Sequence, residues 1–311
     1  MNQDPPKEPH DYHRPVLEDE VVELMAPVVP GVVVDATFGG GGHTRRMLDE
    51  FGDDVTVIAM DRDPEAVANA TGLRAIVVEG NFGDLREVVA HVTDQPVSGV
   101  LFDFGVSSHQ VDEASRGFSY RQDGPLDMRM GPDATVTAAE IVNSWAMSDL
   151  AHLIRTYGEE PLARRIARAI VDARPIDSTA TLSTVIANAM PAARRRAGHP
   201  ARRTFQALRI AVNRELESVA EGIAQAVEIV GVGGRVVAIS YHSLEDRIVK
   251  QYFAEKARGC TCPPDLPVCG CGNTAEVRLL TRKPVRPTDE EVAENNRARS
   301  AVLRAVEKVA S

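Results

Sequence analysis

Residues 35–43 read Asp35-Ala-Thr-Phe-Gly-Gly-Gly-Gly-His43, and they directly follow the apolar run Gly31-Val-Val-Val34. A strand-like run that passes into consecutive glycines is typical of a turn that lies under a bound ligand. Glycine has no Cβ, so it adopts positive φ at little cost and lets a ligand approach the backbone closely. The junction therefore predicts the first strand and the ligand-binding loop of an α/β sheet.

Short apolar runs rich in β-branched residues recur along the chain, with helical segments between them, at 32–34, 55–60, 75–78, 100–102 and 235–240. This alternation predicts an open parallel sheet with helices on both faces. Near the end of the chain, 277–281 and 301–309 are expected to add strands that complete an antiparallel edge, with a helix as the alternative for the second.

The strand rhythm is interrupted in the middle of the chain. Residues 108–203 contain no convincing buried strand, whereas helical patterns recur at 138–145, 148–157, 161–173 and 181–193. A long amphipathic helix is expected next, at about 203–230. The pattern predicts a discontinuous sheet domain, residues 1–107 and 204–311, that carries an inserted all-helical domain, residues 108–203.

The composition of the 311 residues, 43% hydrophobic and 26% charged, suits one large globular domain or a domain with an insertion. No apolar stretch approaches the roughly 20 residues that span a bilayer, and the N-terminus is polar, unlike a signal peptide. We therefore expect a cytoplasmic protein with no membrane partner.

Charge is distributed unevenly along the chain. Residues 1–154 hold 10 Lys and Arg against 27 Asp and Glu, residues 155–214 hold 12 against 4, and residues 215–311 hold 13 against 14. A basic island in an acidic protein indicates a local site for a polyanion such as nucleic acid, and a solvated arginine-rich helix face is the alternative.

All the cysteines fall within a cysteine-rich loop, residues 260–271, as Cys260-x-Cys262 and Cys269-x-Cys271. Four sulfurs this close in sequence favour one structural zinc site in a reducing compartment. Free thiols in a loop are the alternative, because the spacing is tighter than that of most zinc sites.

Acidic residues end three of the predicted strands: Asp35, Asp61 and Asp103. The carboxyl ends of parallel strands meet at one edge of a sheet, where ligands of such folds bind. A dinucleotide would bring an anionic pyrophosphate to this edge, whereas S-adenosylmethionine brings a sulfonium and an ammonium, which the carboxylates favour. Asp61 is placed to accept from ribose hydroxyls, with turn formation as the alternative, and Asp35 either contacts the ligand or braces the turn.

Eight motifs together are similar to those of the bacterial ribosomal RNA small-subunit methyltransferase H family: HRPVL at 13–17, TFGGGGH at 37–43, DRDP at 61–64, FDFGVSS at 102–108, RGFS at 116–119, GPLDMRM at 124–130, TFQALRI at 204–210 and HSLEDR at 242–247. The resemblance implies a class I, Rossmann-like methyltransferase sheet with an inserted helical substrate-recognition domain. It also implies methyl transfer from S-adenosylmethionine to the exocyclic N4 of a cytidine in the decoding region of small-subunit ribosomal RNA, either free or in the assembled subunit.

The resemblance also implies which residues contact the cofactor: Gly41, Gly42, His43, Asp61, Phe82, Asp103 and Gln110. The alternative for Phe82 is an aromatic side chain that packs in the core without contacting the cofactor. Asp103 and His242 are the candidates for a catalytic role, although Asp103-Phe-Gly-Val106 departs from the acid-or-amide, double-proline and aromatic motif of many amine methyltransferases. Asp103 is therefore assigned to the cofactor, with a backbone carbonyl nearby as the proton acceptor, and His242 and Ser243 have helix capping as their alternative.

An enzyme that modifies one base must present it unstacked, so the RNA site is expected to be single-stranded or opened on binding. The arginines expected to contact phosphates are Arg194, Arg195, Arg196, Arg202, Arg203 and Arg209. A non-catalytic RNA-binding factor and a dinucleotide dehydrogenase remain competing hypotheses, and the sequence leaves monomer and homodimer both open.

Overall fold

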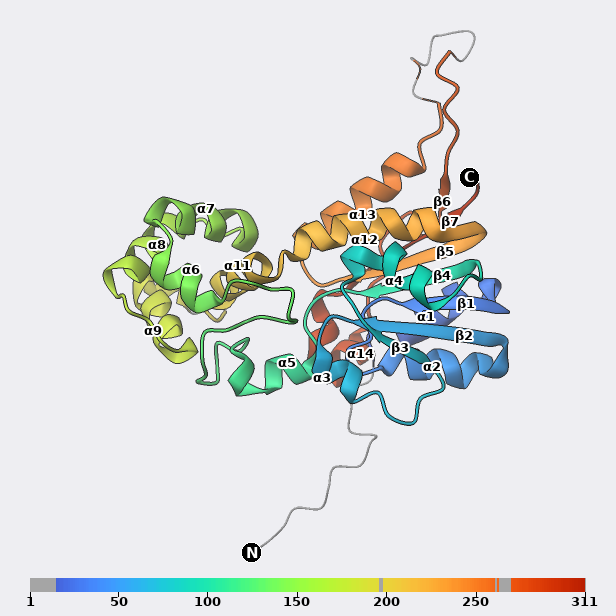
Figure 1. The fold of residues 1–311 in the computed structure, drawn as a ribbon. Coiled ribbons are helices and arrows are strands. Elements are labelled where there is room, and N and C mark those ends of the chain that lie inside the picture. The colour runs from blue at the N-terminus through green and yellow to red at the C-terminus, as the bar shows by residue number, and fades with distance from the viewer. Residues whose placement is uncertain (1–14, 196–197, 261, 263–269, 311) are drawn as a thin grey trace, which may run out of the picture. The chain divides into compact units, whose positions relative to one another are not determined.

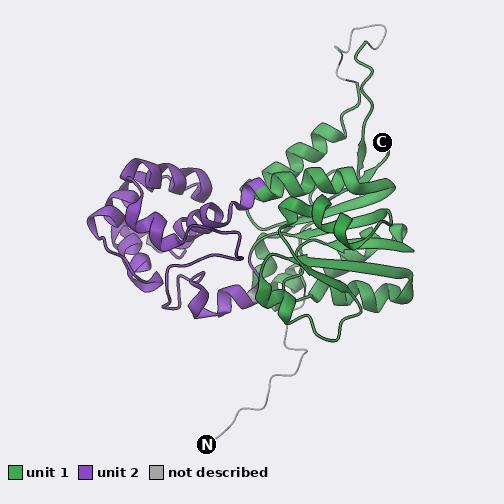
Figure 2. Ribbon diagram, viewed as in Figure 1, with its two compact units in different colours: residues 1–105, 218–311 green, residues 106–217 purple. Residues whose placement is uncertain are grey.

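A computed structural model of the chain describes residues 15–195, 198–260, 262 and 270–310. It divides into two compact units, which Figure 2 colours separately: unit 1 comprises residues 1–105 and 218–311, and unit 2 comprises residues 106–217. Throughout the described ranges, no helix is both long and apolar enough to cross a membrane.

Unit 1 is built on a seven-stranded sheet in the order β3-β2-β1-β4-β5-β7-β6. The strands are β1 (Gly31–Asp35), β2 (Val55–Asp61), β3 (Ile76–Glu79), β4 (Val97–Asp103), β5 (Val230–Ser240), β6 (Val277–Leu279) and β7 (Val302–Lys308). The first five pair in parallel, and β7 pairs antiparallel with both β5 and β6. The predicted parallel sheet and its antiparallel edge are therefore confirmed.

Alternate side chains of the central strands supply two apolar cores, one on each face of the sheet. On one face, Val32 and Val34 pack with α4 (Leu85–Val92), α12 (Glu215–Ile229) and α13 (Ser243–Lys256). On the other face, Val33 packs with α1 (Glu18–Met25) and α2 (Gly42–Phe51). The sheet and these helices can be followed in Figure 1. Burial on both faces explains why β1 is an uninterrupted valine run instead of an alternating one.

Unit 2 contains only helices and loops among its described residues, apart from one isolated bridge between Pro125 and Ser178. Its helices are α5 (Ser108–Asp112), α6 (Ala138–Ser144), α7 (Met147–Gly158), α8 (Ala163–Asp172), α9 (Thr179–Ala189), α10 (Ala192–Arg195) and α11 (Arg202–Asn213). A single core joins α6, α7, α8, α9 and α11, and it includes Leu150, Ile154, Ile166, Ile170, Leu182, Ile186, Phe205 and Leu208. The predicted helical insertion is confirmed.

The prediction of one long helix at about 203–230 is wrong, because two helices, α11 and α12, occupy this stretch. Arg214 adopts a left-handed conformation, with φ of 50°, between α11 and α12. The apolar face of α11 packs into the core of unit 2, whereas α12 covers the sheet. The units consequently divide at 105/106 and 217/218, whereas the sequence placed the boundaries at 107/108 and 203/204.

Asn213, the last residue of α11, ties this helix to the loop that precedes α6. Its Nδ2 donates to the carbonyl of Met128 at 2.7 Å and to that of Arg209 at 3.0 Å, and its Oδ1 accepts from the amide of Met130 at 2.8 Å. Asn213 is only 1% exposed. Met128 has a φ of 63°, which is strained for a non-glycine residue, so these bonds offset a local cost.

We predict that Asn213→Ala lowers the free energy of unfolding of unit 2 by about 2–4 kcal/mol, because it leaves buried backbone groups without partners. Trp145 is the only tryptophan and lies in unit 2, so its fluorescence during urea unfolding reports on this unit. Asn188→Ala, on the exposed side of α9, is the matched control and should change stability by less than about 0.5 kcal/mol. Equal unfolding midpoints for the two variants would contradict this role.

Candidate active site

The candidate site lies at the carboxyl edge of the sheet of unit 1, where the order of the strands reverses. β1 has β2 on one side and β4 on the other, so the chain turns in opposite directions after β1 and β4. Ligands of open α/β sheets bind at such a switch point. Asp35, Asp61 and Asp103 are the last residues of β1, β2 and β4, as the sequence predicted.

The glycine loop leads from β1 into α2 through two left-handed positions. Gly39 has a φ of 52° and Gly41 a φ of 74°. A Cβ at Gly41 would lie 2.7 Å from the ring of Phe38, and the amide of Gly41 already donates to the carbonyl of Phe38 at 2.7 Å. Position 41 therefore accepts only glycine without strain, and α2 begins at Gly42 with its first amides beside the loop.

Asp35 is buried beneath this loop and holds its shape. Its Oδ2 accepts from the hydroxyl of Thr44 at 2.6 Å, and its Oδ1 accepts from the amide of Thr37 at 3.3 Å. Burial raises the pKa of Asp35, which is only 1% exposed. These contacts favour the bracing role over direct contact with a ligand.

Asp61 connects the glycine loop to the start of the next helix. One carboxylate oxygen accepts from the amide of Gly39 at 2.7 Å, and the other accepts from the amide of Asp63 at 2.8 Å. A carboxylate has about four acceptor sites, so two lone pairs remain for hydroxyl donors. Burial raises the pKa of Asp61 to about 6.

Asp103 is the most connected acid of this edge. Its amide donates to the hydroxyl of Thr37 at 2.6 Å, and its Oδ1 accepts from the hydroxyl of Tyr241 at 2.7 Å. Its Oδ2 lies 3.5 Å from Nε2 of His43. The side chain remains 24% exposed, so the carboxylate can reach a ligand as well.

His43 offers buried hydrogen-bonding capacity that the described part of the chain does not use. Its side chain is 6% exposed, and Nε2 faces the carboxylate of Asp103, whereas Nδ1 has no hydrogen-bond partner among the described residues. Burial alone would lower the pKa of His43, but the adjacent carboxylate of Asp103 and the charge of Asp35 leave it raised. An unpartnered buried polar group is costly, so this imidazole suits a ligand with a polar or anionic group.

Tyr241 was missed by the sequence analysis, although it directly follows β5 and so belongs to the same edge. Burial and the charge of Asp103 raise the pKa of Tyr241, which therefore stays a neutral hydroxyl donor. Its hydrogen bond fixes one carboxylate oxygen of Asp103 and leaves the other toward His43.

Phe82 packs in an aromatic cluster, with ring centroids 5.8 Å from Phe102 and 5.5 Å from Phe104. Phe102 and Phe104 are fully buried, whereas Phe82 retains an exposed part. Most of the Phe82 ring therefore packs in the core, as the alternative interpretation expected. Its exposed part is still accessible to an adenine, so the predicted contact stays a prediction.

His242 is the N-cap of α13. Its Nδ1 accepts from the amide of Glu245 at 3.4 Å. In return, the carboxylate of Glu245 accepts from the amide of His242 at 3.2 Å. His242 therefore caps the helix together with Glu245, which was the alternative to a catalytic role. Ser243 does not cap the helix, because it is the first helical residue. The same reciprocal pattern occurs in unit 2, where Gln110 caps α5 with Ser107.

The predicted phosphate contacts lie in unit 2. Arg202 and Arg203 begin α11, and both are exposed. Arg196 and the predicted zinc ligand Cys269 lie outside the described residues, and Arg194 and Arg195 are described only by their backbone, in α10.

Arg209 does not fit the predicted role in RNA binding. Its Nε and Nη2 each donate to one carboxylate oxygen of Glu215 at 2.8 Å, and its side chain is 15% exposed. A bidentate and mostly buried ion pair already satisfies this guanidinium. These contacts favour a structural role for Arg209 in unit 2 over the expected phosphate contact.

Comparisons with known proteins agree across the chain. A model of the MraW methylase family matches residues 10–309. Two relatives, both named ribosomal RNA small subunit methyltransferase H, are 49% identical to this chain. The match to the Heliobacterium modesticaldum protein covers 96% of this chain and 99% of that protein. The match to the Thermomicrobium roseum protein covers 96% of this chain and 94% of that protein. A solved structure of a putative rRNA methylase from Clostridium thermocellum aligns with a TM-score of 0.41 and 12% identity over 94% of this chain and 95% of that chain.

The pKa of Asp61 predicts how cofactor binding depends on pH. In the expected contact with the ribose, the ionised carboxylate accepts through both oxygens, whereas protonation turns one of them into a donor. Affinity for S-adenosylmethionine should therefore be highest well above pH 6 and fall as the pH drops through that value. At pH 5 the affinity should be about tenfold weaker than at pH 7. Calorimetric titrations across this range test the slope, which Asp61→Asn should abolish. If the affinity of Asp61→Asn still depended on pH in the same way, the titrating group would be Asp35 or His43 instead.

Proposed function

The chain belongs to the MraW methylase family, and on this premise we propose that it transfers a methyl group from S-adenosylmethionine to the exocyclic N4 of a cytidine in the decoding region of small-subunit ribosomal RNA. The observation that carries the proposal is the family match over residues 10–309. The names of relatives at 49% identity support small-subunit ribosomal RNA as the methyl acceptor.

S-adenosylmethionine supplies an electrophilic methyl group on a sulfonium, together with an amino-acid ammonium and carboxylate. The carboxylates at the sheet edge suit its cations, and the unpartnered Nδ1 of the His43 imidazole suits its carboxylate. Gly41 and Gly42 give the cofactor close access to the backbone where the loop enters α2, and Asp61 retains acceptor sites for the ribose. These residues fit the cofactor, with Phe82 at the adenine and Gln110 as further proposed contacts.

The chemistry of the acceptor explains what the remaining groups must do. Cytosine N4 is a weak nucleophile because its lone pair is delocalised into the ring, so the protein must accept an N4 hydrogen and align the amine with the methyl carbon. Tyr241 and His43 orient the carboxylate of Asp103, and we assign that carboxylate to the cofactor ammonium. A backbone carbonyl of the segment after β4 is then the acceptor of the amine hydrogen.

Unit 2 supplies the basic surface for the RNA in this proposal. The exposed side of α8 carries Arg164, Arg165 and Arg168, opposite its buried Ile166 and Ile170. With Arg202 and Arg203 at the start of α11, these guanidinium groups give unit 2 a positive surface that sequence-independent phosphate contacts require. A basic helix face with no RNA partner is the alternative that binding experiments decide.

Nucleoside analysis of small-subunit RNA after incubation with the protein and S-adenosylmethionine tests the activity. We expect N4-methylcytidine from assembled or deproteinised subunits and a large loss of turnover in Asp103→Asn. The affinity of Asp103→Asn for S-adenosylmethionine should fall at least about tenfold, because a charged partner of the ammonium is lost. His242→Asn retains an N-cap residue and should keep both quantities within about twofold.

Three results would count against these assignments. Methylation at another cytidine atom would refute the N4 assignment, and cofactor and RNA binding without any transfer would favour a non-catalytic factor. Unchanged cofactor affinity in Asp103→Asn, with turnover lost, would make Asp103 the proton acceptor instead of a cofactor contact.

Paired substitution of Arg202 and Arg203 by alanine should weaken binding of small-subunit RNA and reduce the slope of log affinity against log salt by about 1.5, because two phosphate contacts are lost. Filter binding at several salt concentrations measures both. Arg74→Ala, an exposed arginine of unit 1 that pairs with Asp53, is the control and should leave the slope unchanged. An unaltered salt slope in the double variant would show that the RNA does not contact Arg202 and Arg203.

A further inference from the structure

The segment between α13 and β6 is closed at its base, and its described residues form no apolar core. Lys256 Nζ lies 2.7 Å from Glu276 Oε1, and the amide of Glu276 donates to the carbonyl of Lys256 at 2.9 Å. Figure 1 shows the chain extending beyond this point, away from the sheet of its own unit. None of the described residues from 254 to 276 is buried, so packing does not explain any fixed arrangement within the segment.

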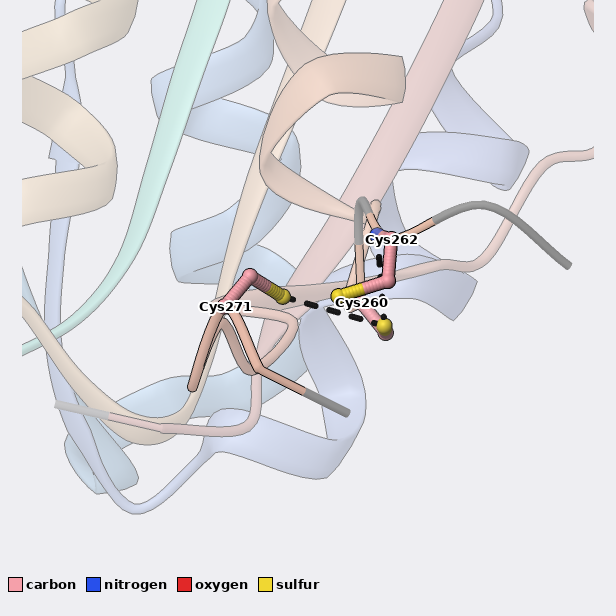
Figure 3. Close-up of side chains that lie close together, drawn as sticks. All are labelled: Cys260, Cys262 and Cys271. Atoms are coloured by element: carbon pink, nitrogen blue, oxygen red, sulfur yellow. Dashed lines mark hydrogen bonds between the residues drawn. The ribbon is translucent and has the colours of Figure 1, made fainter. Parts of the chain in front are cut away.

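Three cysteine side chains of this segment nevertheless converge. The sulfurs of Cys260, Cys262 and Cys271 all lie within 4.8 Å of one another, and the side chains point toward a common centre in Figure 3. Cys260 Sγ and Cys271 Sγ are 3.7 Å apart. Residues eleven positions apart in sequence therefore bring their thiols together without burial to hold them.

The separation of the sulfurs distinguishes between the two ways in which thiols are usually joined. A disulfide requires about 2.05 Å between its sulfurs. Two thiolates bound tetrahedrally to one zinc ion at about 2.3 Å lie about 3.8 Å apart. The observed 3.7 Å, at which the Cys271 thiol donates to Cys260 Sγ, is too long for a disulfide and matches the spacing of two ligands on one zinc ion.

Backbone amides of the segment also face the sulfurs. The amide of Cys262 donates to Cys260 Sγ at 3.4 Å, and the amide of Gly270 donates to Cys262 Sγ at 3.4 Å. Such donors stabilise negative charge on sulfur, which a metal ligand needs. Neutral thiols would gain little from them, because sulfur is a weak acceptor.

We propose that Cys260, Cys262 and Cys271 bind one zinc ion as thiolates, each releasing its proton on binding. Three sulfur ligands leave one position of a tetrahedron for a further donor. The ion ties the two arms of an exposed segment that has no core of its own, which is the usual role of structural zinc in small coreless elements. The site is separate from the carboxylates at the sheet edge and needs none of the chemistry proposed there.

Elemental analysis of the full chain, purified under reducing conditions without chelator, tests the site. We expect about one zinc per chain, and its loss in Cys260→Ser/Cys271→Ser. The metal-free chain titrated with Co²⁺ should develop thiolate-to-cobalt charge-transfer absorption, which the double variant should lack. Thr274→Ser, an exposed change in the same segment that keeps every sulfur, is the matched control and should retain both signals.

Far-UV circular dichroism and S-adenosylmethionine binding should be the same in the double variant and the parent chain, which separates loss of metal from loss of fold. Removal of zinc should also speed tryptic cleavage after the exposed Arg258. Absence of both bound zinc and the cobalt absorption in the reduced parent chain would overturn the proposal. A Cys260–Cys271 disulfide in peptides of the alkylated native protein, with no bound metal, would overturn it as well.

Discussion

The carboxyl ends of β1, β4 and β5 are joined by a small set of hydrogen bonds centred on Asp103, and the candidate site depends on them. The amide of Asp103 donates to the Thr37 hydroxyl, which follows β1, and its carboxylate accepts from Tyr241, which follows β5. Each bond crosses between neighbouring strands, and the first of them lies at the switch point between β1 and β4. The position of this carboxylate is therefore set by the sheet itself and does not rely on a flexible loop.

Electrostatics make this edge selective. Asp35 and Asp61 are largely removed from water, and the resulting rise in their pKa values reflects the cost of holding negative charge there. A cationic ligand lowers that cost, whereas a pyrophosphate raises it. Burial alone would lower the pKa of His43, and the nearby carboxylates raise it because they favour the protonated imidazole. The acidic character of this edge thus favours a cationic ligand and a protonated His43.

The elements that the sequence predicted well are those with a strong local pattern. The valine run of β1, the glycine loop and the acids at the strand ends all lie where their periodicity and turn chemistry indicated. The misses depend on contacts between distant residues. The bidentate pairing of Arg209 with Glu215 and the turn at Arg214 follow from how α11 packs in unit 2, and the bond from Tyr241 to Asp103 spans 138 positions. No local pattern carries that information.

The central claim is that the sheet edge of unit 1 binds a cationic methyl donor and not a dinucleotide. Parallel calorimetric titrations of the full chain with S-adenosylmethionine and with NADH test it most directly. We expect saturable binding of S-adenosylmethionine near neutral pH and no heat of binding for NADH. Binding of NADH without binding of S-adenosylmethionine would show that the edge is a dinucleotide site.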